Sequence, residues 1–155
     1  MQTSTVIHPD FDTAVKLTVY TSITETAEAP SATEVAERVG ASPAEVEAAF
    51  ARLHAKRLLV PEPGDPSRIR MAPPFSGVVT PFLVEAKGRR YYANCVWDGL
   101  GIPAALHEDA VISASDGFTG EPLALEVKSN RSRPRECVIH FAVPAARWWE
   151  DIIYT

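Results

Sequence analysis

Two helix-start signals lie close together near the N-terminus, and they constrain this chain more than any other feature of its sequence. Ser31 is followed three residues later by Glu34, and Ser42 is followed in the same way by Glu45. Each pair has the pattern of a capping box, in which two side chains satisfy the free N–H groups at a helix start. Gly40, between the two pairs, suits the left-handed residue that ends a helix. The sequence therefore predicts two short helices joined by the tight connection VGAS.

Apolar residues at helical spacing support three helices in the first third of the chain. The segment DFDTAVKLTVYTSIT has Asp10 at its start and an apolar stripe formed by Phe11, Val15, Val19 and Ile23. The segment that begins with Ser42 and Pro43 has an apolar face formed by Val46, Ala49, Phe50 and Leu53. We expect these faces to pack together as the core of a helical module.

The elements that follow predict a winged helix-turn-helix pattern. LLVP, a Pro/Gly-rich turn at 61–66 and RIRM read as a strand, a turn and a second strand after the helices. Such modules often bind DNA, but residues 1–64 contain nine acidic and only five basic residues. Glu45 and Glu47 also open the helix that would enter the DNA groove. We therefore predict a structural winged-helix-like module over residues 1–72 and no nucleic-acid partner.

After the loop APPFSGVVTP the period changes from helical to strand-like. FLVEA and RRYYAN, joined by Lys87 and Gly88, predict a hairpin, and AVISA, LALEV and CVIHFAV predict three further strands. Turn residues stand at 116–117, 119–120 and 130–134. Residues 73–155 are therefore predicted to form an α+β domain with a mainly antiparallel sheet.

Two helices are expected in this second domain. CVWDGLGIPAAL predicts a short helix interrupted by Gly99, Gly101 and Pro103, and PAARWWEDII predicts a last helix that starts at Pro144. We expect this second domain, residues 73–155, to carry the catalytic or metal-binding residues.

Bulk properties exclude some classes of protein. No apolar run approaches the roughly 18 residues of a membrane span, and the start of the sequence has no signal-peptide pattern, so we expect a cytoplasmic protein without a membrane partner. The two cysteines are then expected to be reduced thiols. The net charge of −5 argues against general binding to polyanions.

The pair Cys95 and Asp98 is the main candidate for chemistry. Cys95 falls where a strand is expected to end and a helix to begin, and the free N–H groups of a first helical turn lower the pKa of a thiol there. Asp98 falls on the same helix face and could deliver a proton if burial keeps its carboxyl protonated. The alternative is a buried cysteine next to an aspartate that only stabilises the helix start. Spacing alone favours that alternative.

The other candidate residues have weaker patterns. Cys137 opens the predicted strand CVIHFAV, on the face opposite to His140, and a buried structural cysteine is the favoured interpretation. The four histidines have no metal-ligand spacing, and no Gly-rich phosphate loop or G-x-S-x-G motif occurs. Trp97 and the two adjacent tyrosines, Tyr91 and Tyr92, are expected in the core or in a pocket wall.

Two stretches resemble the organomercurial (alkylmercury) lyase family: RRYYANCVWDGLGIPAALHEDAVISASDGFTGEPLALEV and HFAVPAARWWEDIIYT. The helical segment that runs into APPFSGVVTPF is similar to that family's N-terminal region. The resemblance implies protonolysis of a carbon–mercury bond, which gives a hydrocarbon and mercuric ion. The family's motif Y-A-x-C-x-x-D falls on Cys95, as the mercury-binding nucleophile, and on Asp98, as the proton donor. Soft thiolates suit a soft metal.

The resemblance also implies partners and a second thiol. It implies a small organomercurial substrate, small thiols that remove the product, a mercuric reductase as a further partner, and no organic cofactor. It places the family's second cysteine just after the segment that looks like WWEDIIYT. Cys137 falls earlier than that position, so the second role is not carried over to it, and it stays only a further candidate metal ligand beside Cys95. Asp116 stands where another cysteine is common in the family. Two alternatives follow: a lyase whose second cysteine follows Thr155, or a divergent member that binds soft metals or thiol-reactive ligands through Cys95.

Overall fold

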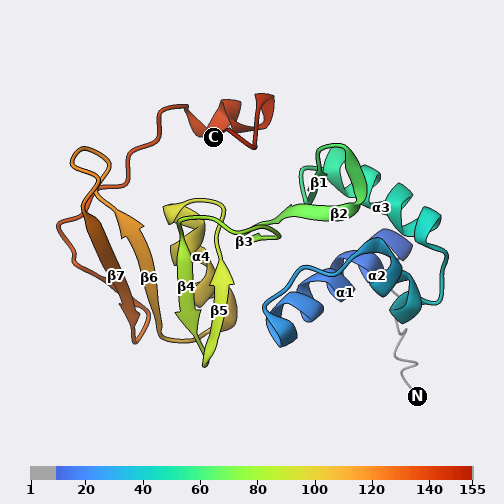
Figure 1. The fold of residues 1–155 in the computed structure, drawn as a ribbon, viewed down its shortest axis with the longest axis horizontal. Coiled ribbons are helices and arrows are strands. Elements are labelled where there is room, and N and C mark those ends of the chain that lie inside the picture. The colour runs from blue at the N-terminus through green and yellow to red at the C-terminus, as the bar shows by residue number, and fades with distance from the viewer. Residues whose placement is uncertain (1–9, 155) are drawn as a thin grey trace, which may run out of the picture. The chain divides into compact units, whose positions relative to one another are not determined.

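A computed structural model of the chain describes residues 10–154 (Figure 1). Its internal contacts divide the chain into two compact units at the junction between Ala72 and Pro73. None of the described helices is long and apolar enough to cross a membrane.

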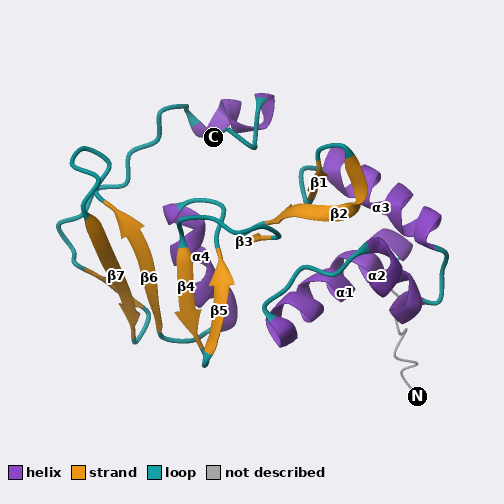
Figure 2. Ribbon diagram, viewed as in Figure 1, coloured by secondary structure: helices purple, strands orange, loops and turns teal. Residues whose placement is uncertain are grey.

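The first unit consists of three helices and a hairpin (Figure 2). Its elements are α1 (Phe11–Thr26), α2 (Ala32–Val39), α3 (Pro43–Ala55), β1 (Val60–Glu62) and β2 (Asp65–Ala72). β1 and β2 pair antiparallel. The predicted helices and hairpin are confirmed, whereas the identity of this unit as a winged helix stays a prediction.

Local capping explains where these helices begin. Both predicted capping boxes are formed: the side chains of Ser31 and Ser42 each accept a hydrogen bond from the backbone three residues on, and Glu34 and Glu45 bond back. Gly40 ends α2 with a φ of 70°, in the left-handed region that favours glycine. Interactions between residues at most four positions apart therefore determine both ends of α2 and the start of α3.

The apolar stripes meet in the core of this unit. Most of the predicted residues are buried, namely Val15, Val19, Ile23, Val46, Ala49, Phe50 and Leu53, while Phe11 lies nearer the surface. Asp12 is only 9% exposed, and it accepts hydrogen bonds from the guanidinium of Arg52, the shortest at 2.7 Å. The Arg52 hydrogen bonds hold the pKa of the Asp12 carboxyl below its usual value, which compensates for its burial.

The second unit is built on a five-stranded antiparallel sheet with the strand order β5-β4-β6-β7-β8. Its elements are β3 (Phe75–Ser76), β4 (Leu83–Ala86), β5 (Arg89–Tyr92), α4 (Val96–Leu106), β6 (Ala110–Ser115), β7 (Pro122–Lys128), β8 (Arg131–Arg133) and the 3-10 helix η1 (Ala145–Glu150). The α+β class and the antiparallel sheet are confirmed.

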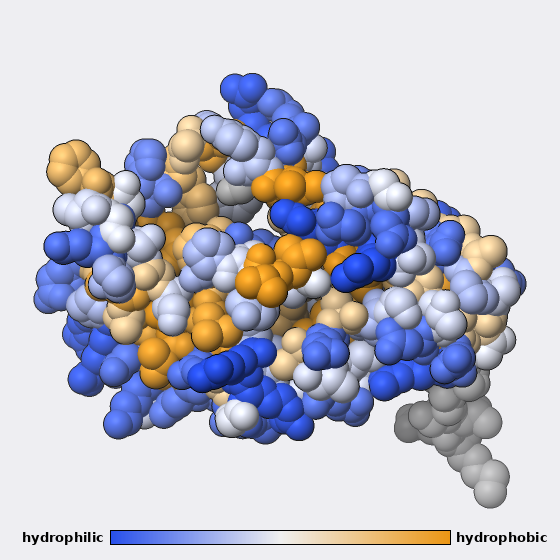
Figure 3. Space-filling model, in the orientation of Figure 1, coloured by the Kyte–Doolittle hydropathy of each residue, from blue (hydrophilic) through white to orange (hydrophobic). Residues whose placement is uncertain are grey.

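The two faces of the sheet differ in what covers them. The face with Val84, Ile112 and Leu125 is buried, and α4 packs against it, behind the sheet in Figure 1. The other face is open, and its register aligns Arg90, Glu85, Val111 and Glu126 in one row across four strands. Polar side chains dominate the surface in Figure 3, with smaller apolar patches between them. The core of this unit therefore lies between α4 and one sheet face.

The helix α4 is continuous, which corrects the prediction that three residues interrupt it. Pro103 lies within the helix, and its neighbour Ile102 is fully buried. A Cβ on Gly99 would lie 2.9 Å from Cγ2 of Ile112, so glycine is what allows the helix to approach the sheet. Packing on the sheet therefore maintains the helix across residues that disfavour it locally.

We expect a Gly99→Val variant to lower the free energy of unfolding of the second unit by about 1–3 kcal/mol, because the added side chain overpacks the contact with Ile112. Urea unfolding followed by tryptophan fluorescence measures this unit alone, since all three tryptophans lie after Pro73. Gly117→Val is the matched control, because a Cβ at Gly117 has no atom within 4 Å. Equal loss of stability in both variants would contradict the close-packing argument.

The predicted strand CVIHFAV is wrong, and the sheet ends earlier. β8 (Arg131–Arg133) forms the edge instead, within the segment predicted as a turn, and residues 137–143 have no regular secondary structure. Pro134 has no N–H to continue the ladder, so the chain leaves the sheet at that point. The predicted last helix is only the six-residue 3-10 helix η1, which follows Pro144.

Candidate functional site

Cys95 lies at the junction between β5 and α4, as predicted. It is the N-cap residue of α4, in extended conformation with φ −149° and ψ 177°. Its carbonyl accepts the first helical hydrogen bond, from the N–H of Gly99 at 2.9 Å. Asp98 is then the third residue of the helix, so both side chains belong to the first turn.

Hydrogen bonds to Ala93 fix the backbone just before this turn. The N–H of Ala93 donates to the carbonyl of Phe82 at 2.9 Å, and the hydroxyl of Thr80 donates to the carbonyl of Ala93 at 2.6 Å. Phe75 pairs with Ala93 in an isolated β-bridge. The loop before β4 and the strand β3 therefore position the start of α4.

The pKa of the Cys95 thiol differs from the prediction. Burial raises the pKa of this half-buried thiol, instead of the helix start lowering it. The backbone N–H groups of Asp98 and Trp97 lower the pKa, as predicted, but they do not offset burial, and the Asp98 carboxylate adds repulsion that raises it further. The desolvation of sulfur outweighs the N–H groups of the first turn, so the pKa of the Cys95 thiol lies above its ordinary value.

The Asp98 carboxyl has the property that the proton-donor hypothesis needs. Burial raises its pKa, and a hydrogen bond from the side chain of Asn94 opposes part of that shift. The amide Nδ2 of Asn94 lies 2.8 Å from Oδ2 of Asp98 and 3.3 Å from the carbonyl oxygen of Phe75. A buried carboxyl with a raised pKa can hold a proton at a pH where an exposed one has lost it.

Asn94 is the site residue that sequence reasoning missed. Its Oδ1 is buried and has no hydrogen-bond partner among the described residues, while its Nδ2 holds two acceptors. Asn94 precedes the N-cap residue Cys95, so it lies outside the helix, and the helical spacing rules give no signal for this pair. The contact with Phe75 depends on tertiary structure and leaves no local signal.

An aromatic cluster joins the irregular C-terminal segment to the first turn of α4. The rings of Trp97 and Phe141 meet edge to face with centroids 6.3 Å apart, and those of Phe141 and Trp148 lie 4.9 Å apart. The indole N–H of Trp148 donates to the carbonyl of Val143 at 2.8 Å. Trp97 is 55% exposed, so it does not lie in the core. It forms part of an exposed aromatic wall to which α4 and the C-terminal segment both contribute.

Cys137 is exposed, so the prediction of a buried structural cysteine is wrong. It precedes Phe141 by four residues, and an extended chain of that length spans at most about 14 Å. The contact between Phe141 and Trp97 therefore limits how far Cys137 can lie from the start of α4. His140, in the same segment, is exposed.

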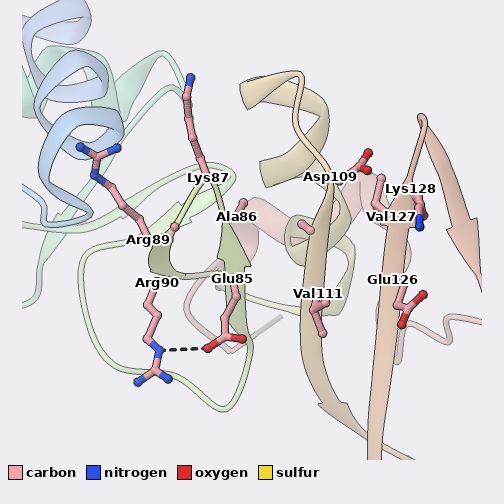
Figure 4. A pocket seen from close by; sticks show the side chains of 12 residues that line it. Glu85, Ala86, Lys87, Arg89, Arg90, Asp109, Val111, Glu126, Val127 and Lys128 are labelled. Atoms are coloured by element: carbon pink, nitrogen blue, oxygen red, sulfur yellow. Dashed lines mark hydrogen bonds and ion pairs between the residues drawn. The ribbon is translucent and has the colours of Figure 1, made fainter.

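Two of the hollows in the described part of the second unit lie beside α4 and beside the β4–β5 hairpin. An open groove of about 340 Å³ follows one side of α4 and is lined by Trp97, Leu100, Gly101 and Ala104, with Val127, Asn130 and Ser132 opposite. It begins at Trp97, two residues from Cys95, and has no charged side chain. The larger hollow, about 550 Å³, lies beside the β4–β5 hairpin and is lined by charged residues, including the ion pair of Glu85 and Arg90 (Figure 4). Neither hollow is lined by Cys95, Asp98 or Cys137.

The described part of the chain contains no group of three or more His, Cys, Asp or Glu side chains that could hold a metal ion. Of the predicted site residues, the structure brings Cys95 and Asp98 into one helical turn. It leaves Cys137 on a separate segment that the aromatic cluster ties to that turn.

Comparisons with known proteins agree with this picture of the fold. The family model of alkylmercury lyase (MerB) matches residues 75–155, which is more than half of the chain. A crystal structure of the mercury-bound form of MerB2 matches with a TM-score of 0.64 and 22% sequence identity, over 82% of this chain. The chain spans 62% of that protein's length, and at this identity the match shows the fold alone. No curated protein matches the sequence.

Proposed function

The chain belongs to the alkylmercury lyase family, and from that premise we propose that it cleaves the carbon–mercury bond of small organomercurials by protonolysis. The observation that carries the proposal is the first turn of α4, which combines a half-buried thiol at Cys95 with a half-buried carboxyl at Asp98 whose pKa is raised. A soft thiolate is the ligand that a soft metal such as mercury prefers.

The proposed reaction uses these two groups in sequence. The Cys95 thiolate displaces the exchangeable ligand X of the organomercurial R–Hg–X, so that an S–Hg bond forms, and X⁻ and the thiol proton leave to solvent. Asp98 then gives its proton to the carbon as the carbon–mercury bond breaks, and the electron pair of that bond forms the new C–H bond. The products are a hydrocarbon, a mercuric ion bound to sulfur and the carboxylate of Asp98. The carboxylate is stabilised by the hydrogen bond from Asn94.

The groove along α4 supports an apolar organic group on the substrate. Its α4 side is formed by Trp97, Leu100, Gly101 and Ala104, and Trp97 belongs to the same helical turn as Asp98, although neither Cys95 nor Asp98 lines the groove. Burying an alkyl or aryl group there would gain roughly 25 cal/mol for each Å² removed from water. The proposed partners are therefore an alkyl- or arylmercury substrate and, for product removal, small thiols and a mercuric reductase in the cytoplasm. In this proposal the first unit is a structural winged-helix module without a nucleic-acid partner.

The experiment that tests the proposal measures products and adducts together. The protein is incubated with phenylmercuric acetate and a small thiol, and benzene is measured by gas chromatography while mass spectrometry follows the protein. Catalytic release of benzene in excess of the protein is the expected result. A protein that keeps the intact phenylmercury adduct one-to-one would replace the lyase by the second candidate, a soft-metal binding protein. One observation favours that candidate: Cys137 is exposed on a separate segment, so the first turn of α4 itself contains a single thiol.

Cys137 is proposed as the second ligand of the mercuric product. A Cys137→Ser variant should capture phenylmercury as the parent does, because Cys95 is unchanged, but should lose mercuric ion to a competing small thiol at least about 10-fold faster, since one thiolate is removed. Dialysis against glutathione, sampled over time with protein-bound mercury measured by atomic absorption, gives the rate of this loss. Identical retention by variant and parent would remove Cys137 from the site.

A further inference from the structure

We propose that Asn94 is a positioning residue that fixes the Asp98 carboxyl, holding Oδ2 as a hydrogen-bond acceptor and leaving Oδ1 as the oxygen that carries and delivers the proton. This inference rests on the proposed function and assigns a role to a residue outside the C-x-x-D motif. The amide contacts of Asn94 carry it.

The orientation of the Asn94 amide follows from its two neighbours. The backbone carbonyl of Phe75 can only accept a hydrogen bond, so the group that lies 3.3 Å from it must be the NH₂. The same NH₂ lies 2.8 Å from Oδ2 of Asp98 and has a second N–H to donate. Oδ2 is therefore the acceptor in both protonation states of Asp98, and a proton on this carboxyl resides on Oδ1.

The backbone around Asn94 is held firmly enough to maintain this geometry. On one side, both the N–H and the carbonyl of Ala93 are hydrogen-bonded, to Phe82 and from Thr80. On the other side, Cys95 begins α4 through its own carbonyl. The backbone therefore fixes the position from which the Asn94 side chain donates to Phe75 and Asp98.

The buried Oδ1 of Asn94 gives a second, independent sign of a functional role. It has no hydrogen-bond partner among residues 10–154, and burying an acceptor without a partner is destabilising. Leucine would fill a similar volume without that cost. The amide is therefore explained by what its NH₂ group does for Asp98 and not by packing.

The test compares Asn94→Leu with a matched control, Thr80→Val. Both variants remove side-chain hydrogen bonds at the same junction, but only the first touches Asp98. Asn94→Leu should release benzene from phenylmercuric acetate about 10–100-fold more slowly, the usual effect of losing an outer hydrogen-bond partner of a site, with one-to-one capture of phenylmercury within twofold of the parent. Thr80→Val should keep both properties within threefold. Unchanged release in Asn94→Leu, or a loss of release equal to that in Thr80→Val, would overturn the proposal.

A second measurement separates this proposal from the lyase proposal. If the parent releases no benzene, the proposed function fails, and the NMR resonances of the Asn94 side-chain amide then decide the role of Asn94. One amide proton should be shifted downfield by the Asp98 carboxyl and should move upfield in Asp98→Ala, while the proton bonded to Phe75 stays in place. Amide resonances that do not respond to Asp98→Ala would overturn the positioning role regardless of turnover.

Discussion

An Asp98→Asn variant should capture an organomercurial as the parent does and release its hydrocarbon at least about 100-fold more slowly, the usual contribution of a positioned general acid. The carboxyl is half-buried and its pKa is raised, which favours its protonated form, and an amide cannot supply such a proton. The amide oxygen of the variant can still accept the hydrogen bond from Asn94, so the first turn should keep its structure.

Single-turnover experiments provide the measurement for this variant. The enzyme is held in excess over phenylmercuric acetate, and benzene is followed over time while mass spectrometry counts the phenylmercury adduct. The expected result is a full adduct that decays slowly. A variant that releases benzene at the parent's rate would exclude Asp98 as the proton donor, and one that also fails to form the adduct would point to a folding defect.

A Cys95→Ser variant is expected to lose capture of organomercurials altogether, under both the lyase and the binding-protein hypotheses. A serine hydroxyl is a hard ligand that stays protonated near neutral pH, so it offers mercury no comparable bond. Equilibrium dialysis with phenylmercuric acetate measures the loss. Cys137→Ser is the matched control, because Cys137 is exposed and lies on a different segment. Retention of phenylmercury by Cys95→Ser at the parent's stoichiometry would place the site elsewhere.

The pH dependence of capture follows from the same thiol. Burial raises the pKa of Cys95, so the fraction of thiolate at neutral pH is smaller than for an exposed cysteine. The rate of alkylation by iodoacetamide, read at Cys95 by mass spectrometry, should therefore keep rising at a pH where a free cysteine has reached its plateau. If the rate reached its plateau at a lower pH than for free cysteine, the N–H groups of the helix start would lower the pKa of Cys95 more than burial raises it.

The local elements of this fold were predictable because short-range interactions determine them. Ser31 and Ser42 cap their helices through hydrogen bonds that span three residues, so the sequence pattern alone locates the two helix starts. The same reasoning placed Cys95 at the start of a helix, with Asp98 in its first turn. Elements of this kind need no knowledge of the distant chain.

The errors occurred where distant parts of the chain compete. CVIHFAV has the composition of a strand, but β8 occupies the sheet edge before it and Pro134 ends the ladder. Gly99 and Pro103 disfavour a helix locally, yet α4 is continuous because it packs on the sheet through Ile102. Pairing and burial outweigh local preference in both cases.

The candidate site divides in the same way. The sequence by itself determined which residues share the first turn of α4, because the spacing of Cys95 and Asp98 and the strand-to-helix change are local properties. Only the tertiary structure decided that burial raises the pKa of both groups, and that Asn94 bridges Asp98 to Phe75. Desolvation depends on every atom that excludes water from a group, and those atoms come from segments far apart in the chain.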